Sequence, residues 1–188
     1  MPTMSCNVPC GHAWTGCVAT AMSQVMKYYN YPTNYNWTDM PNNYATNSTA
    51  ILMKDIGNAI DMDYQYDGSG ASMNDVPGAF RNDFNYNHAS HADYSYQTVM
   101  NELDYNRPVI LSGGRNNGWW IFGHYTDGHA WVCDGYLETV DPCCCTYLSL
   151  HMNWGWNGAY NGWFYFNDFN PANYTFNYDT EMIYNIHP

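Results

Sequence analysis

The feature of this sequence that most constrains its fold is a change in the spacing of apolar residues near Arg107-Pro108. Before this point apolar side chains recur every three or four residues, as in helices. After it they occur in short runs separated by glycine, asparagine and proline, as in strands. Helices followed by strands predict an α+β fold. We expect one domain over residues 1–188, with a mainly helical lobe at 1–107 and a mainly antiparallel β lobe at 108–188.

The same spacing places the individual elements. Helices are predicted at residues 17–29, 48–60, 74–84 and 96–103, and Pro32 stops the first of them. Strands are predicted around residues 109–111, 130–133, 147–152, 163–166 and 182–186. A chain of 188 residues can bury a substantial core without depending on metals or disulfides.

The charge balance excludes some classes of partner. The chain has 5 Lys and Arg residues against 17 Asp and Glu residues, which gives a net charge of −12. Nucleic acid requires clustered cations and anionic membranes disfavour an acidic surface, so we expect neither as a partner. No segment has the length of a transmembrane helix and the N-terminus lacks a signal-peptide pattern. We therefore expect a soluble chain that is either a processed form or shown without its targeting sequence.

Two residues far apart in the sequence form a candidate nucleophile and base. Cys17 stands at the head of the first predicted helix, where the helix N-terminus stabilises a thiolate. His129 lies on a predicted strand and shares a face with Trp131 and Cys133. If the next strand pairs antiparallel, that face can also present Asn153, whose side-chain oxygen would hold the imidazole in one tautomer. A cleft between the two halves of the chain would bring Cys17 and His129 together.

Each of these residues also has a plainer explanation. A cysteine in an Ala-rich helix is commonly a small buried apolar residue, and a lone histidine or asparagine commonly serves the backbone. A metal site can be drawn from His124, His129, His151 and Cys133, but their spacing matches no compact ligand motif. We therefore expect no metal and no cofactor.

Several separated segments, taken together, resemble the streptopain family of papain-like cysteine peptidases. These segments follow one another in consistent order over roughly residues 11 to 171: 16–21, 24–28, 30–32, 52–57, 61–64, 128–130, 153–156 and 162–164. The resemblance implies a two-lobed papain-like fold and endopeptidase activity on proteins and peptides. It also implies secretion by bacteria as a zymogen and a preference for a hydrophobic side chain just before the residue that is cut.

The resemblance also assigns roles by position. Cys17 would be the nucleophile, His129 the general base and later acid, and Asn153 the orienting residue. Substrate contacts would come from three neighbours of these residues: Gly128, Trp154 and Trp156. Papain-like enzymes usually supply a Gln upstream of the nucleophile to the oxyanion, and no Gln precedes Cys17. The donor then lies on a segment not shown, or Asn7 or His12 replaces it, or the site is impaired.

Two further questions stay open at the level of sequence. Six cysteines remain besides Cys17, which permits disulfides without fixing their pairing: Cys6, Cys10, Cys133, Cys143, Cys144 and Cys145. The competing function is a peptidase-fold protein with little or no turnover, which binds peptides or glycans through its aromatic surface. The oligomeric state is equally open.

Overall fold

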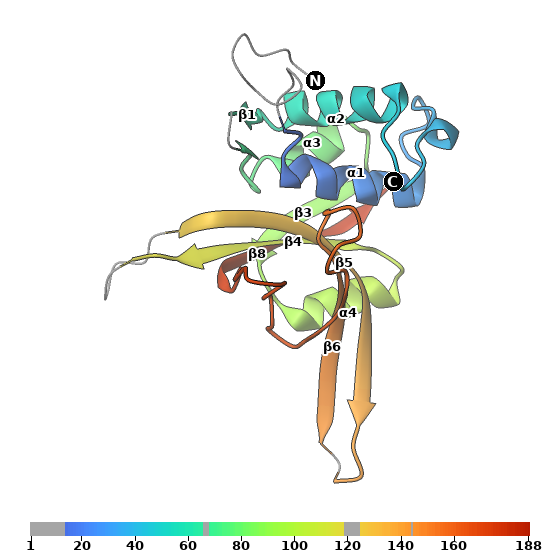
Figure 1. The fold of residues 1–188 in the computed structure, drawn as a ribbon. Helices are drawn as coiled ribbons and strands as arrows, with labels where there is room; N and C mark the ends of the chain where they lie inside the picture. Colours follow the sequence, from blue (N-terminus) through green and yellow to red (C-terminus); the bar gives the residue numbers. More distant parts are fainter. Residues whose placement is uncertain (1–13, 66–67, 119–124, 144) are drawn as a thin grey trace. The chain divides into compact units, whose positions relative to one another are not determined.

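The structure is a computed structural model that describes residues 14–65, 68–118, 125–143 and 145–188. The chain divides into two compact units, Met1–Ala89 with His187–Pro188 and Ser90–Ile186. Helices dominate the first unit and a sheet dominates the second, which confirms the α+β class (Figure 1). The division falls before the expected boundary at Arg107-Pro108, because the helix that includes Val99 packs on the sheet of the second unit.

The first unit is built around α1 (Cys17–Tyr29), whose bounds are those expected from the apolar stripe. Its side chains Val25 and Met26 are fully buried. The unit also contains α2 (Asn47–Ala59), α3 (Val76–Asn82), the 3₁₀ turn η2 (Trp37–Asp39) and a small antiparallel pair, β1 (Asp63–Tyr64) and β2 (Ser69–Gly70).

The second unit is built on a six-stranded sheet in the order β3-β8-β4-β5-β6-β7. Strand β4 pairs antiparallel with β5 and β8, β5 pairs with β6, and β6 pairs with β7. The helix α4 lies beside this sheet (Figure 1). The element bounds are β3 His88–Asp93, α4 Tyr96–Asp104, β4 Val109–Asn116, β5 Tyr125–Val140, β6 Thr146–Asn153, β7 Gly162–Tyr165 and β8 Tyr178–His187.

One face of the sheet forms the core of the second unit. Because strand side chains alternate, each strand contributes every second residue to this face. The core members include Val99, Val109, Leu111, Trp131, Cys133, Leu150, Met152, Trp154, Phe169, Phe176 and Met182. His129 precedes Trp131 by two positions on β5, so its ring lies at the margin of the same aromatic core.

The observed elements extend most of the predicted ones. Strand β5 continues to Val140 although its apolar run ends at Cys133, because backbone pairing with β6 continues into an exposed hairpin. Strand β3 was not predicted, since its sequence has no apolar alternation. Among the described residues, no helix has both the length and the apolar character needed to cross a bilayer.

Candidate functional site

Cys17 is the first residue of α1, so its backbone N–H is one of the groups at the helix start that lack an intrahelical acceptor. The chain enters the helix through Gly16, whose φ of 82° lies in the left-handed region that favours glycine. The Gly16 carbonyl accepts hydrogen bonds from the backbone N–H and the hydroxyl of Thr20. The side chain of Cys17 is partly exposed and is a thiol. Cys17 is therefore a helix-head cysteine, that is, a free thiol on the first residue of a helix.

His129 is held on β5 by one polar contact and several rings. Its Nε2 lies 2.8 Å from the backbone carbonyl oxygen of Trp154. A carbonyl oxygen can only accept, so Nε2 carries the proton and the lone pair of the neutral ring is on Nδ1. The imidazole lies 4.8 Å from the Trp156 ring and 5.1 Å from the Phe176 ring, centroid to centroid. Burial among these rings lowers the pKa of His129, and the carbonyl contact acts in the opposite direction.

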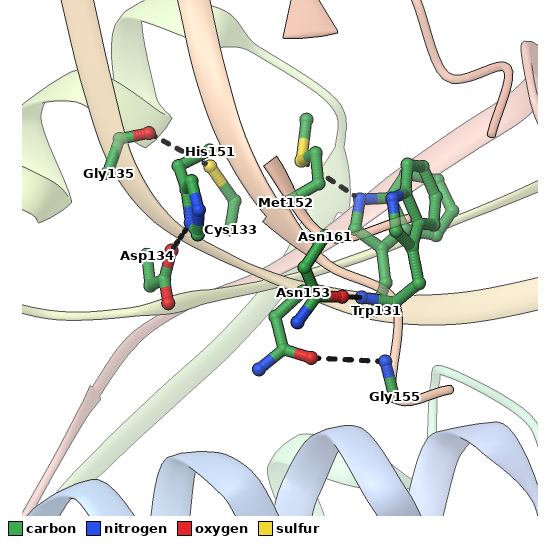
Figure 2. A network of polar contacts seen from close by, with 10 residues as sticks. Trp131, Cys133, Asp134, Gly135, His151, Met152, Asn153, Gly155 and Asn161 are labelled. Atoms are coloured by element: carbon green, nitrogen blue, oxygen red, sulfur yellow. Dashed lines mark hydrogen bonds and ion pairs between the residues drawn. The ribbon is translucent and has the colours of Figure 1, made fainter. Parts of the chain in front are cut away.

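The peptide that anchors His129 is itself fixed by two asparagines. The Asn161 side-chain oxygen accepts from the N–H of Trp154 at 3.0 Å, and the Asn153 side-chain oxygen accepts from the N–H of Gly155 at 3.1 Å. Figure 2 shows both amide oxygens directed at the backbone of this turn. With a hydrogen bond on each side, the orientation of the Trp154 carbonyl is defined by its neighbours.

The expectation that Asn153 shares a face with His129 was wrong. In the register of β5 and β6, Cys133 pairs with Met152 and Val132 pairs with Asn153. Directly paired residues share a face, so Asn153 lies on the face of Val132, opposite to that of Trp131 and His129. The sequence predicted that the Asn153 side-chain oxygen accepts from the imidazole, whereas the acceptor at Nε2 of His129 is the Trp154 carbonyl.

The three predicted substrate contacts are placed differently from one another. Trp154 is 0% exposed and packs in the core, so its indole supports His129 and is not accessible to a substrate. Gly128 and Trp156 line a cavity of about 950 Å³ within the second unit, and His129 borders the same space. Arg115 and Tyr174 also line this cavity, and the sequence interpretation assigned neither of them a role.

The remaining cysteines differ in burial. Cys133 is fully buried, and burial raises the pKa of its thiol to about 12. Cys143 and Cys145 are exposed thiols near the tip of the β5–β6 hairpin. Asn7 and His12, the alternative oxyanion donors, and Cys6, Cys10, Cys144 and His124 lie outside the described residues. Within the described parts of the chain, no three His, Cys, Asp or Glu side chains gather as metal ligands would.

Cys17 belongs to the first unit, and His129, Asn153, Trp154 and Trp156 belong to the second. Sequence reasoning missed the Trp154 carbonyl, because a main-chain acceptor leaves no mark on residue type. It also missed Arg115. Its rarity was the available signal, since Arg115 is one of 5 basic residues. The structure places it on β4, the strand that pairs with the strand of His129.

Known proteins share both the sequence and the fold of this chain. The sequence model of the Peptidase C10 family matches residues 2–34 and 33–164. Streptopain of Streptococcus pyogenes is 30% identical over 206 residues, which cover 86% of this chain and 48% of streptopain. The thiol protease/hemagglutinin PrtT of Porphyromonas gingivalis is 29% identical over 225 residues, 94% of this chain and 24% of PrtT. The chain thus spans about half the length of streptopain.

A solved structure agrees with these sequence matches. The active wild-type interpain A cysteine protease of Prevotella intermedia aligns with a TM-score of 0.76 and 29% identity, covering 97% of this chain and 86% of that chain. The similarity confirms the predicted papain-like fold class and the predicted resemblance to streptopain. Since the family model matches well over half of the residues, this chain belongs to the Peptidase C10 family.

Proposed function

We propose that this chain is a cysteine endopeptidase in which Cys17 is the nucleophile and His129 is the general base and acid. The observation that carries the proposal is the contact between His129 Nε2 and the Trp154 carbonyl, which leaves the basic lone pair on Nδ1. A helix-head cysteine and an imidazole held in a single tautomer are the two components that thiol catalysis requires. Membership of the Peptidase C10 family supports the same reading.

The proposed reaction proceeds through an acyl-enzyme. Nδ1 of His129 accepts the thiol proton, the sulfur of Cys17 adds to the scissile carbonyl, and the imidazolium then protonates the leaving amine as the C–N bond breaks. Water, deprotonated by the same imidazole, hydrolyses the thioester. These steps require the thiol and the imidazole to come within hydrogen-bond reach of each other. Backbone N–H groups at the start of α1 provide the positive end of a helix dipole for the anionic sulfur.

The other predicted site residues take supporting roles in this proposal. Asn153 acts as a positioning residue, because its side chain fixes the turn from which the Trp154 carbonyl reaches His129. Gly128 and Trp156 contact the substrate in the cavity that borders His129. We further propose that the substrates are proteins and peptides and that the enzyme acts outside the cell, as the resemblance to the streptopain family implies.

The test is hydrolysis of unfolded casein by the purified chain in reducing buffer. Wild type is expected to cleave casein, and Cys17→Ala and His129→Ala are each expected to abolish cleavage. Asn153→Ala is expected to reduce turnover less than His129→Ala does, since the carbonyl contact persists. EDTA is expected to have no effect, whereas iodoacetamide is expected to stop the reaction.

The exposed thiols provide the matched control. Cys143→Ser/Cys145→Ser removes the exposed thiols that the described residues place outside the proposed site, and this variant is expected to retain activity and to lose it on alkylation. Retention of hydrolysis by Cys17→Ala would overturn the assignment of the nucleophile. Failure of the wild-type chain to cleave casein, together with peptide binding by both wild type and Cys17→Ala, would point instead to a binding protein.

A further inference from the structure

The cavity beside His129 is lined by Arg115, a cation that has no role in the proposed reaction. Within the second unit this space of about 950 Å³ is bordered by His129 and lined by Trp156 and Tyr174. The rings of His129 and Trp156 lie 4.8 Å apart, and those of Trp156 and Tyr174 lie 5.2 Å apart, so the aromatic wall runs without a break from the proposed base. Arg115 and Asp127 are the charged side chains that line the cavity.

The backbone of β4 is irregular where it brings Arg115 to this cavity. The register of β4 shifts between Gly113 and Arg115 against β5, and between Ser112 and Gly114 against β8. A Cβ added at Gly113 would lie 2.1 Å from the Phe176 carbonyl oxygen, so only glycine admits this close approach of the aromatic segment. Bulges redirect the side chains that follow them. Arg115 is the first residue after the shift against β5.

The guanidinium of Arg115 differs in its partners from most cations of the chain. Lys27 and Arg81 donate to main-chain carbonyls, and Arg107 donates to Asn185. The ion pairs and side-chain donor contacts of the described residues do not include the Arg115 guanidinium. The planar guanidinium can donate two parallel hydrogen bonds to a carboxylate, and carboxylates are the protein groups that match this geometry. In a chain of net charge −12, such a cation compensates locally for the repulsion of an acidic ligand.

We propose that Arg115 selects peptide substrates that place a Glu or Asp side chain in the cavity beside His129. The aromatic wall of Trp156 and Tyr174 covers the methylene stem, and the guanidinium binds the carboxylate. Asp127 opposes this preference, because its carboxylate borders the same space without pairing with Arg115. The inference rests on the proposed peptidase function, since it names a residue type that the cavity beside His129 would accept from a peptide substrate.

Binding to the Cys17→Ala chain tests the proposal apart from catalysis. A single glutamate is moved through successive positions of a neutral fluorescent peptide, and each peptide is compared with its glutamine counterpart by anisotropy at low salt. At one position glutamate is expected to bind about two- to fivefold tighter, the range of an exposed ion pair. The preference is expected to shrink as salt is added.

Two variants, one that removes the positive charge of the cavity and one that removes its negative charge, test which side chain causes the glutamate preference. Arg115→Gln in the Cys17→Ala background is expected to remove the glutamate preference, and Asp127→Asn, the matched control on the same cavity, is expected to increase it. Equal binding of glutamate and glutamine peptides at every position would overturn the proposal. So would a glutamate preference that persists unchanged in Arg115→Gln.

Hydrolysis of the same peptides by the wild-type chain separates this proposal from the function on which it rests. A glutamate preference in binding without any cleavage would support the role of Arg115 and contradict the peptidase proposal. Cleavage with no difference between glutamate and glutamine peptides would support the peptidase and contradict the role of Arg115.

Discussion

At the scale of single residues, the environment of His129 sets its protonation. The ring lies among Trp154, Trp156 and Phe176, and burial there lowers its pKa from the ordinary value of 6.5. A histidine buried in its neutral form must take up a proton when the chain unfolds in acid. The stability that this residue contributes is therefore fully present above pH 6.5 and is lost as the pH falls through the lower folded pKa.

We predict that His129 in the Cys17→Ala chain titrates by NMR with a midpoint below 6.5. This variant lacks the thiol, so the midpoint reports the effect of burial on the pKa of the imidazole. The free energy of unfolding is expected to fall below that pH, and His129→Gln is expected to lack this part of the fall. Urea unfolding at a series of pH values measures the second effect. A midpoint at or above 6.5 in the Cys17→Ala chain would contradict the burial argument.

The sequence predicted Cys17 at the start of a helix and His129 on a strand, and the structure has both elements, because each depends on a local apolar pattern. The sequence was not sufficient to place Asn153. The face of that residue depends on the pairing of Val132 with Asn153, which single-strand alternation does not determine. The indole of Trp154 was misplaced for a related reason, since burial of a tryptophan is decided by neighbours that are distant in sequence.

At the scale of elements, β4 shows how close packing constrains the cavity. Gly113 lies on β4 directly under the Phe176 carbonyl, and backbone atoms at 2.1 Å from an added Cβ cannot be moved aside as a side chain can. Gly78 on α3 is the opposite case. A Cβ there would meet Asn82 Nδ2 only at 3.9 Å, which is ordinary contact.

We predict opposite effects for the two substitutions to alanine. Gly113→Ala is expected to destabilise the fold by about 1–3 kcal/mol, the usual cost of an overpacked position. Gly78→Ala is expected to stabilise it by about 0.5–1 kcal/mol, because alanine is the better helix former. Urea unfolding of both variants against wild type is the measurement. A neutral Gly113→Ala would mean that the Phe176 segment does not pack on β4 as described.

The bounds of helices and strands were predicted best where apolar residues recur at regular spacing along the element. The apolar stripe of α1 gave both of its ends, Cys17 and Tyr29. The predicted helix at 74–84 is shorter in the structure, as α3 begins at Val76 with Pro77 in its first turn and ends at Asn82. The hairpin of β5 and β6 extends beyond its apolar runs, because backbone hydrogen bonds continue there without a buried face.

At the scale of the whole molecule, the scarce cations are mostly committed to internal contacts. Lys27, Arg81 and Arg107 each donate to a partner within the chain, whereas the exposed side chains of Lys54 and Arg115 have no hydrogen-bond or ion-pair partner among the described residues. Cleavage of a folded chain requires local opening of the segment around the cut. The α+β class followed from the change in apolar period, but the division of the chain did not, because α4 joins the sheet.

We predict that the native Cys17→Ala chain resists trypsin at pH 7.5 and that the first cuts occur at Lys54 or Arg115. Heating before digestion is expected to allow cleavage after Lys27, Lys54, Arg81 and Arg115, whereas trypsin does not cut the bond between Arg107 and Pro108. Gel electrophoresis and mass spectrometry of a time course give the order of cleavage. Early cutting at Lys27 or Arg81 in the unheated chain would contradict the structural assignment of their contacts.

The acceptor that holds His129 is the main-chain oxygen of Trp154, and this has an evolutionary consequence. Every amino acid carries such an oxygen, so mutation at position 154 can alter the shape of the turn but cannot delete the acceptor atom. If His129 is the base proposed above, a search that requires a third polar side chain would overlook a chain whose histidine is oriented by a main-chain oxygen.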